Sequence, residues 1–555
     1  MTTDLDQQSF DYVVVGSGFG GSVAAFRLAQ KGYQVAVFEM GKRFNAEDFP
    51  NTNWEIRRFL WLPHLGCYGI QKMDLLKNIM ILSGTGVGGG SLVYGNTLFT
   101  PLADFFEQPV IQDIGGRKSL LPYFEMARNM LGVVDNPVLF EPDELLKQTA
   151  AEYNREFTFQ PSPVGIFFGE ENTTVSDPYF LGEGPDRTGC NFCGGCFIGC
   201  RYNAKNSLDK NYLYFAQKFG ATIIPETEVV DVKPLSADGS EGYTIETRKV
   251  PGFWRSKPQE YRTKGVVFSG GVLGSLKLLL KLKQNKHLSR LSDRLGHDVR
   301  TNGETILGVK SRNKDVDYSR GIAASSSVFP DEHTHIQADR YPAGSDAMGL
   351  LGTMLTDGAG RLPRPIRLLG NILRSPLDFI RLSYPVGFAQ RSMILVVMQN
   401  QDSGLQIIRK RSLMLPCRWK LSSISQENTA LPTYIPLAHD FARRLAHRMN
   451  GLPGNTINEV LFNTPTTAHI LGGCCMAENE NQGVVDLHHR VFGYKNMLIC
   501  DGSVIPANLG VNPALSITAF AERALSFIPV KEDQKGNLKL LAFEKQQDIG
   551  HLLTP

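Results

Sequence analysis

The sequence predicts an α/β fold, α+β overall, in which a domain built on a parallel sheet is joined to one built on an antiparallel sheet. Two observations support this prediction. Near the N-terminus an apolar run, a glycine-rich turn, a helical segment and a second apolar run follow one another. Between about residues 310 and 464, short alternating runs such as 393–398 and 405–408 are typical of antiparallel strands. A chain of 555 residues has room for two to four domains of about 150 residues.

The first element is the glycine turn within residues 11–39. Gly16 allows a tight turn, Gly18 lets the backbone approach a pyrophosphate, and Gly21 lets the helix pack closely on the strand. The helix N-terminus then presents free N–H groups to the phosphates. Glu39 ends the second strand, where a carboxylate accepts ribose hydroxyls and disfavours a 2′-phosphate, so FAD or NAD is favoured over NADP. The turn consists of Gly16, Ser17, Gly18, Phe19, Gly20 and Gly21. A Rossmann-type dinucleotide-binding domain is therefore predicted.

A second glycine-rich stretch spans residues 83–96. Five of the seven positions from 84 to 90 are glycine, which lets the backbone lie against something flat or charged. A flexible linker is the alternative, but apolar residues follow at once instead of a polar spacer. The connection from 41 to 80 is longer than a simple crossover needs, so a lid or wrapping segment is expected there.

The C-terminal block, residues 467–528, holds the third motif. His469 lies three residues before the glycine pair Gly472 and Gly473, and Gly502 directly follows Asp501. Asn512 and Pro513 then lead into a helical pattern, as an N-cap and a first-turn proline would. The N-terminus of a helix that begins after Pro513 would stabilise negative charge on the ring of a bound cofactor.

These three segments resemble the glucose–methanol–choline oxidoreductases, and most closely their cholesterol-oxidase-like bacterial branch. The resemblance implies that FAD is the cofactor and that the second glycine stretch wraps the flavin and its pyrophosphate. One departure is that Tyr94 stands where the family often has Asn, with Asn96 two residues on. Besides the first turn and Glu39, the FAD contacts implied are Gly86, Gly90, Gly95, Asn96, Val229, Gly502, Asn512 and Ala514.

The chemistry implied by the resemblance is oxidation of an alcohol. That reaction must remove the O–H proton and deliver a hydride to flavin N5. Histidine, with an ordinary pKa of about 6.5, suits the proton transfer. The resemblance makes His469 the acid/base and Asn512 its positioning companion, with a sterol such as cholesterol or a long-chain alcohol as substrate.

Several alternatives to this function are open. One is an FAD alcohol dehydrogenase that passes electrons to a carrier instead of O2, through an iron–sulfur centre bound by the cysteines of residues 190–200. A second is a non-redox flavin enzyme on the same fold, such as a light-driven decarboxylase, and a third is a non-catalytic flavin-binding protein. His469 could also be a structural histidine beside a glycine turn.

A cysteine loop, residues 190–200, has the spacing C-x2-C-x2-C-x3-C. The spacing matches a bacterial [4Fe–4S] run, except that Arg201 replaces the usual Pro, and in two-cluster ferredoxins the fourth cysteine serves the other cluster. Four thiolates also suit zinc. The alternative is a cysteine-lined turn near the flavin, with or without a disulfide. The candidate ligands are Cys190, Cys193, Cys196 and Cys200.

The domain division expected is discontinuous. Residues 1–116, 190–309 and 465–530 would form the FAD-binding domain, residues 117–189 and 310–464 the substrate or cap domain, and 531–555 a C-terminal tail. Within the cap, residues 361–382 mix five arginines with leucine and isoleucine at helical spacing. Such a stretch rests on an anionic membrane surface or packs on its own protein.

Composition narrows the remaining choices. Net charge is +3 with 42% hydrophobic and 20% charged residues, so neither nucleic acid binding nor disorder is indicated. The first ten residues lack a secretory signal, and we see no apolar run of about 20 residues. Nine cysteines without an export signal indicate reduced thiols. A cytoplasmic protein is expected, with peripheral membrane contact as a further alternative.

Overall fold

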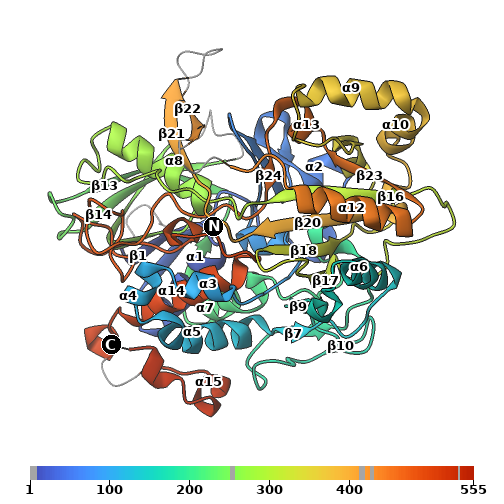
Figure 1. Cartoon of the computed structure of the whole chain (residues 1–555). Coiled ribbons are helices and arrows are strands. Elements are labelled where there is room, and N and C mark those ends of the chain that lie inside the picture. Colours follow the sequence, from blue (N-terminus) through green and yellow to red (C-terminus); the bar gives the residue numbers. More distant parts are fainter. Residues whose placement is uncertain (1–8, 251–256, 412–418, 426–430, 535–537, 555) are drawn as a thin grey trace.

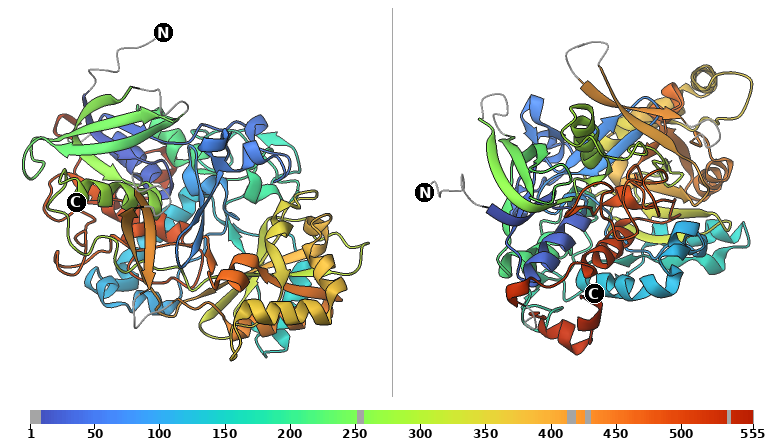
Figure 2. Two further views of the ribbon diagram at one scale, coloured as in Figure 1. Left: turned by 90° about the horizontal axis from the view of Figure 1, so that it is seen from above. Right: turned by 90° about the vertical axis from the view of Figure 1, so that its left-hand side faces the viewer.

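The computed structural model describes residues 9–250, 257–411, 419–425, 431–534 and 538–554. The chain is arranged around two sheets, which lie in separate lobes (Figures 1 and 2). No helix in these ranges is both long enough and apolar enough to cross a bilayer.

The first sheet confirms the predicted parallel architecture. Its strands β12, β2, β1, β15 and β25 are parallel, while β14 and β13 extend the sheet as an antiparallel meander. β1 is buried along almost its whole length, as expected of a strand covered on both faces. The strands are β1 (Ser9–Val15), β2 (Val35–Phe38), β12 (Thr222–Ile224), β13 (Thr227–Pro234), β14 (Tyr243–Lys249), β15 (Gln259–Phe268) and β25 (Met497–Ile499).

A layer of helices packs beside this sheet. Helix α1 (Phe19–Gln30) lies against α14 (Ala514–Ser526) and α7 (Tyr212–Lys218), and α14 lies against α5 (Gly116–Leu131). Every residue of α1 after Phe19 is buried, so this helix has no solvent face. Helix α8 (Gly271–Gln284) follows β15 and packs against β13 and β21 (Leu405–Arg411).

The C-terminal residues are part of this layer. Glu544, in α15 (Ala542–Gln546), accepts a hydrogen bond from Nη1 of Arg27, and Glu522 pairs with Nε of the same guanidinium at 2.6 Å. Arg27 and Glu544 are fully buried, and Phe543 joins the hydrophobic core. Removing one member of such a network would leave a buried charge without a partner, which costs about 3–5 kcal/mol.

The second sheet is antiparallel and alternates between two environments. On β20 (Ser392–Gln399), Met393, Leu395 and Val397 pack into a core beneath α12 (Pro436–Arg448) and α6 (Glu141–Ala151). Ile394 and Val396 point the opposite way, into a cavity. The strand order is β19 (Gly352–Met354), β23 (Gly451–Thr456), β16 (Thr305–Ser311), β20, β18 (Thr334–Asp339), β17 (Ala324–Val328) and β8 (Gln160–Pro161).

Two elements that we assigned to the cap share the first core instead. Helix α5 contributes Leu120 and Phe124 to the core formed with α1 and α14. Strand β21 pairs with β22 (Trp419–Ser425) as a hairpin, and its Leu405 and Ile407 pack in the same core. Position along the sequence does not say which sheet a helix or a strand pair covers. The rest of the domain division remains a prediction.

Candidate active site

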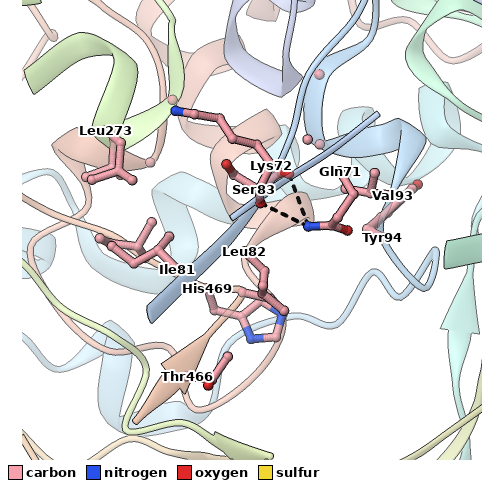
Figure 3. Close-up of a pocket in the computed structure, with 18 of the residues that line it drawn as sticks. Gln71, Lys72, Ile81, Leu82, Ser83, Val93, Tyr94, Leu273, Thr466 and His469 are labelled. Atoms are coloured by element: carbon pink, nitrogen blue, oxygen red, sulfur yellow. Dashed lines mark hydrogen bonds between the residues drawn. The ribbon is translucent and has the colours of Figure 1, made fainter. Parts of the chain in front are cut away.

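A large cavity runs between the two sheets. It has a volume of about 620 Å³ and is lined by the glycine turn and second glycine stretch at one side and by β16, β18 and β20 at the other. Figure 3 shows one wall, on which His469, Leu82 and Thr466 lie together beside Ser83 and Gln71. The lining of the cavity therefore comes from the N-terminal and C-terminal parts of the sequence and from the antiparallel sheet.

The predicted cofactor residues largely meet at this cavity. A Cβ on Gly18 would have no atom of the described chain within 4 Å, so the space beside this backbone is open to a ligand. A Cβ on Gly20, in contrast, would lie 1.6 Å from the carbonyl oxygen of Cys500, because α1 packs directly on the chain before Asp501. The predicted residues that line the cavity are Gly16, Gly18, Phe19, Gly20, Glu39, Gly90, Gly95, Val229, Gly502, Asn512 and Ala514.

Three predicted cofactor residues do not line the cavity. Gly21 has the packing role expected of it, since its Cβ would lie 2.1 Å from the carbonyl oxygen of Gly16. Gly86 has a φ of +127°, and its N–H donates to Glu39 at 3.3 Å, so it shapes the loop from behind. Asn96 is buried and has a φ of 69°. Asparagine adopts this left-handed conformation more readily than most residues, so the backbone conformation explains its presence at this position.

Glu39 lies at the end of β2, facing the cavity. Its carboxylate accepts hydrogen bonds from the backbone N–H groups of Ser17 (3.1 Å) and Gly41 (2.9 Å) and from the Ser17 hydroxyl (2.8 Å). Burial raises the pKa of Glu39, while these donors favour the ionised form. The side chain thus links the strand end to the glycine turn at the position where a ribose would bind.

His469 is positioned by a short strand and a buried threonine. Strand β24 (Thr466–Thr467) pairs in parallel with β6 (Met80–Gly84), which lines the cavity. The Thr467 hydroxyl accepts a hydrogen bond from the backbone N–H of His469 at 2.9 Å and donates to Glu304 at 2.7 Å. The next turn requires Gly472, whose Cβ would lie 2.1 Å from the carbonyl oxygen of Asp298.

The contacts of the imidazole assign its proton. Nε2 lies 3.2 Å from Nδ2 of Asn512, and since an amide N–H can only donate, Nε2 accepts this hydrogen bond. In the neutral ring the proton is then on Nδ1, which lies 3.0 Å from a carboxylate oxygen of Glu304 without hydrogen-bond alignment. Nε2 is therefore the basic nitrogen, and Glu304 stabilises the ring when it becomes charged.

Asn512 does not cap α14 as the sequence indicated. Pro513 occupies the N-cap and the helix begins at Ala514. The Asn512 amide instead donates to Gln337 and His469, both at 3.2 Å, while its Oδ1 is buried without a partner in the described part of the chain. An unpaired oxygen beside a base is available to accept a hydrogen bond from a hydroxyl.

Sequence reasoning did not select Glu304, Gln337 or Asp339, which also line the cavity. Gln337 and Asp339 are two residues apart on β18 and so share a face; polar residues at this spacing in a buried strand were the available signal. Burial raises the pKa of Asp339 well above its usual range, which favours the protonated carboxyl. Glu304 had no comparable signal, because it meets Thr467 and Ala468 only in the fold.

The cysteine loop lies apart from His469. All eight described cysteines are free of disulfides, and no three His, Cys, Asp or Glu side chains in the described ranges are arranged to hold a metal ion. Neither the iron–sulfur nor the zinc expectation for Cys190, Cys193, Cys196 and Cys200 is therefore supported by the described residues. Either site needs its thiolates gathered around one metal ion or one cluster.

Comparisons with known proteins agree with this geometry. Residues 437–521 match the family model of GMC oxidoreductases, and residues 14–64 match an NAD(P)-binding Rossmann-like domain. The chain is 46% identical to a cholesterol oxidase of Acinetobacter baumannii, covering 95% of this chain and 96% of that protein. It belongs to the GMC oxidoreductase family. A Mycobacterium tuberculosis cholesterol oxidase is 44% identical over 94% of this chain and 91% of its own.

More distant relatives show how widely this fold is shared among GMC oxidoreductases. A long-chain-alcohol oxidase of Arabidopsis thaliana is 25% identical, covering 92% of this chain and 66% of that protein. Pyridoxine 4-oxidase from Mesorbium loti superposes with a TM-score of 0.59 at 12% identity, covering 92% of this chain and 97% of that one. The predicted family and fold are confirmed, and the cavity with its glycine cradle fits the FAD expected of a GMC oxidoreductase.

Proposed function

We propose that this GMC oxidoreductase oxidises the hydroxyl of a bulky apolar alcohol, and that a sterol is preferred to a long-chain alcohol. The observation that carries the proposal is a single cavity in which a basic histidine nitrogen and an unpaired amide oxygen lie between the glycine cradle and an apolar sheet wall. The cholesterol oxidases at 44–46% identity support the sterol, and the 25% identical long-chain-alcohol oxidase supports the wider class.

The proposed roles follow from the contacts of each side chain. His469 Nε2 accepts the hydroxyl proton, and the Glu304 carboxylate 3.0 Å from Nδ1 stabilises the resulting imidazolium. The Asn512 amide N–H occupies the single Nε2 lone pair when no substrate is bound. When the alcohol binds, this N–H can donate to the alcohol oxygen instead, which leaves Nε2 free to accept the hydroxyl proton. FAD, when bound in the cradle, supplies the flavin ring that accepts the hydride from the carbinol carbon.

The apolar wall sets the substrate class. Ile306, Ile394 and Val396 project from the antiparallel sheet into the cavity, and Leu382 and Phe388 border it from the helices beyond. Burying apolar area stabilises a bound ligand by about 25 cal/mol per Å², so a ring system gains far more than a short alcohol. The sheet face therefore favours a large hydrocarbon over a sugar or choline.

Oxygen uptake with hydrogen peroxide formation tests the substrate and the acceptor together. We expect turnover with cholesterol and related 3-hydroxysterols, weaker turnover with long-chain alcohols, and none with glucose or choline. Peroxide equal to the ketone formed supports O2 as acceptor. Turnover that requires an added dye would instead favour the alternative dehydrogenase, and turnover of glucose or choline alone would overturn the substrate assignment.

We further propose that residues 361–382 contact a lipid surface. They form helices α9 (Arg364–Arg374) and α10 (Pro376–Ser383) at the outer edge of the molecule (Figure 1). Leu368 of α9 is buried, but six apolar residues of this hairpin face solvent, each more than half exposed: Leu362, Ile366, Leu369, Leu373, Leu377 and Ile380. The buried side of α9 instead carries Arg364, which pairs with Glu459 at 3.1 Å. An exposed apolar stripe flanked by Arg361 and Arg374 suits an anionic bilayer.

Vesicle flotation tests the lipid contact. The protein should float with phosphatidylcholine vesicles that contain phosphatidylglycerol, and the double variant Ile366→Asp/Leu373→Asp should not. Phe157→Asp is the matched control, because Phe157 is as exposed as Leu373, at 74%, and lies outside the hairpin. Equal flotation of the double variant and the control would show that this hairpin does not bind the lipid surface.

A further inference from the structure

Gln337, on β18, lies beside Asn512 in the wall of the large cavity and is 1% exposed. Its Oε1 accepts a hydrogen bond from Nδ2 of Asn512 at 3.2 Å, the one hydrogen bond of its side chain within the described part of the chain. Its Nε2 is buried without a partner there. A buried donor without a partner is costly, so a role in packing alone would favour an apolar side chain at this position.

The contact with Gln337 gives the Asn512 amide nitrogen a partner for each of its two hydrogens. One N–H donates to Gln337, and the other donates to Nε2 of His469, also at 3.2 Å. The two hydrogens of an amide lie in one plane with its oxygen, so the bond to Gln337 fixes the direction in which the second N–H points. Gln337 thus selects which end of the Asn512 amide faces the imidazole.

The opposite orientation of the Asn512 amide conflicts with the groups around it. In that orientation Oδ1 would face Nε2 of His469, and the neutral ring would need its proton on Nε2 to donate to this oxygen. Nδ1 would then present a lone pair to the Glu304 carboxylate, which lies 3.0 Å away. Oδ1 would also face Oε1 of Gln337, and two acceptor oxygens at hydrogen-bond distance repel each other. Glu304 and Gln337 therefore favour the same state, in which Nε2 is the basic nitrogen.

We propose that Gln337 is a positioning residue for the alcohol oxidation, which acts by orienting Asn512 toward His469 and the substrate. The inference rests on the proposed function, in which the Asn512 N–H donates to the alcohol oxygen while Nε2 of His469 accepts the hydroxyl proton. Without the Gln337 oxygen, the Asn512 amide is free to turn over. A turned amide presents an oxygen in place of the N–H, so the alcohol oxygen loses its donor and the ring proton moves to Nε2.

Anaerobic flavin reduction by cholesterol, measured per bound flavin, tests this role in Gln337→Met. Methionine has nearly the same length as glutamine but carries no amide oxygen, so one hydrogen bond is lost and reduction should slow by about fivefold to tenfold. Gln337→Glu retains an acceptor oxygen and should recover most of the rate. Gln399→Met is the matched control, since Gln399 lies on the neighbouring strand β20 outside the cavity, and it should react at the native rate.

A double-mutant cycle with Asn512 separates positioning from packing. In the Asn512→Ala background, Gln337→Met should cause no further slowing of flavin reduction, because the amide that Gln337 orients is absent. The same slowing of about fivefold to tenfold in both backgrounds would show that Gln337 acts independently of Asn512 and would overturn the proposal. A Gln337→Met rate equal to the native rate would overturn it too, and so would a Gln337→Glu rate no faster than that of Gln337→Met.

Neutron diffraction tests the orientation of Asn512 without turnover, because it locates the deuterium atoms that distinguish the two ends of an amide. In the native protein Asn512 should direct a deuterium at a bare Nε2 of His469, and in Gln337→Met both orientations should be present. One unchanged orientation in the two proteins would overturn the inference. Failure of every alcohol to reduce the native protein would instead overturn the proposed function, and the neutron structures distinguish these two failures.

Discussion

Replacing Glu304 by Gln isolates the contribution of one buried charge to the proposed proton transfer. The two side chains have the same shape, so the introduced amide oxygen can still accept from Thr467 and Ala468. Two unit charges 3.0 Å apart interact by about 5 kcal/mol at an effective dielectric constant of roughly 20. The amide dipole restores part of this, which leaves a loss of about 2–3 kcal/mol in the transition state, comparable to a hydrogen bond between charged groups.

The assay is anaerobic stopped-flow reduction of the bound flavin at saturating substrate. A loss of about 2–3 kcal/mol slows this step by roughly 30- to 160-fold. Substrate affinity should change little, because the proposed role of Glu304 is exerted through the histidine. Glu304→Asp retains the charge and should recover much of the rate, and exposed Glu478→Gln is the charge-matched control. A reduction rate of Glu304→Gln within twofold of the native rate would refute the assigned role of this carboxylate.

Three further predictions concern other parts of the structure. Asn512→Ala should weaken substrate binding and slow flavin reduction by about tenfold, since one hydrogen bond of about 1–1.5 kcal/mol is lost; an unchanged steady-state KM and rate would contradict this. Gly20→Ala should yield no soluble flavoprotein, because its Cβ would lie 1.6 Å from a carbonyl oxygen, whereas Gly274→Ala, with no atom of the described residues within 4 Å, should express normally; equal yields would contradict the packing. Burial lowers the pKa of His335 and of His489 to about 3, below the unfolded value of about 6.5. Each histidine therefore lowers the free energy of unfolding as the pH falls below about 6.5, by about 2 kcal/mol near pH 5. Between pH 7 and pH 5, urea unfolding of His335→Phe should show a decrease in this free energy that is about 2 kcal/mol smaller than that of the native protein. An equal decrease in the two proteins would contradict the assignment.

The parts of the site that the sequence predicted are those that need only local patterns. The glycine turn, Glu39 and the helix after it form one contiguous unit, so spacing alone places them at the cavity. The pairing of His469 with Asn512 came from the family resemblance and agrees with the observed 3.2 Å contact.

The parts that the sequence did not predict depend on long-range packing. Glu304 meets the histidine loop across 164 residues, a contact that no spacing encodes. The spacing of the apolar residues in α9 correctly predicted a helix. Periodicity alone cannot say which face of a helix is buried, and in α9 the side chain of Arg364 is buried. Asn512 and Pro513 suit a helix start, yet the Asn512 amide is used by His469 and Gln337.

The most direct measurement of the central claim is anaerobic reduction of the flavin by cholesterol in the native protein and in His469→Gln. The native protein should lose its yellow colour in a single turnover. His469→Gln, with its flavin spectrum intact, should react at least about 100-fold more slowly, as expected when a general base is removed. Equal bleaching of the two proteins, or a native protein that no sterol or long-chain alcohol can reduce, would contradict the account.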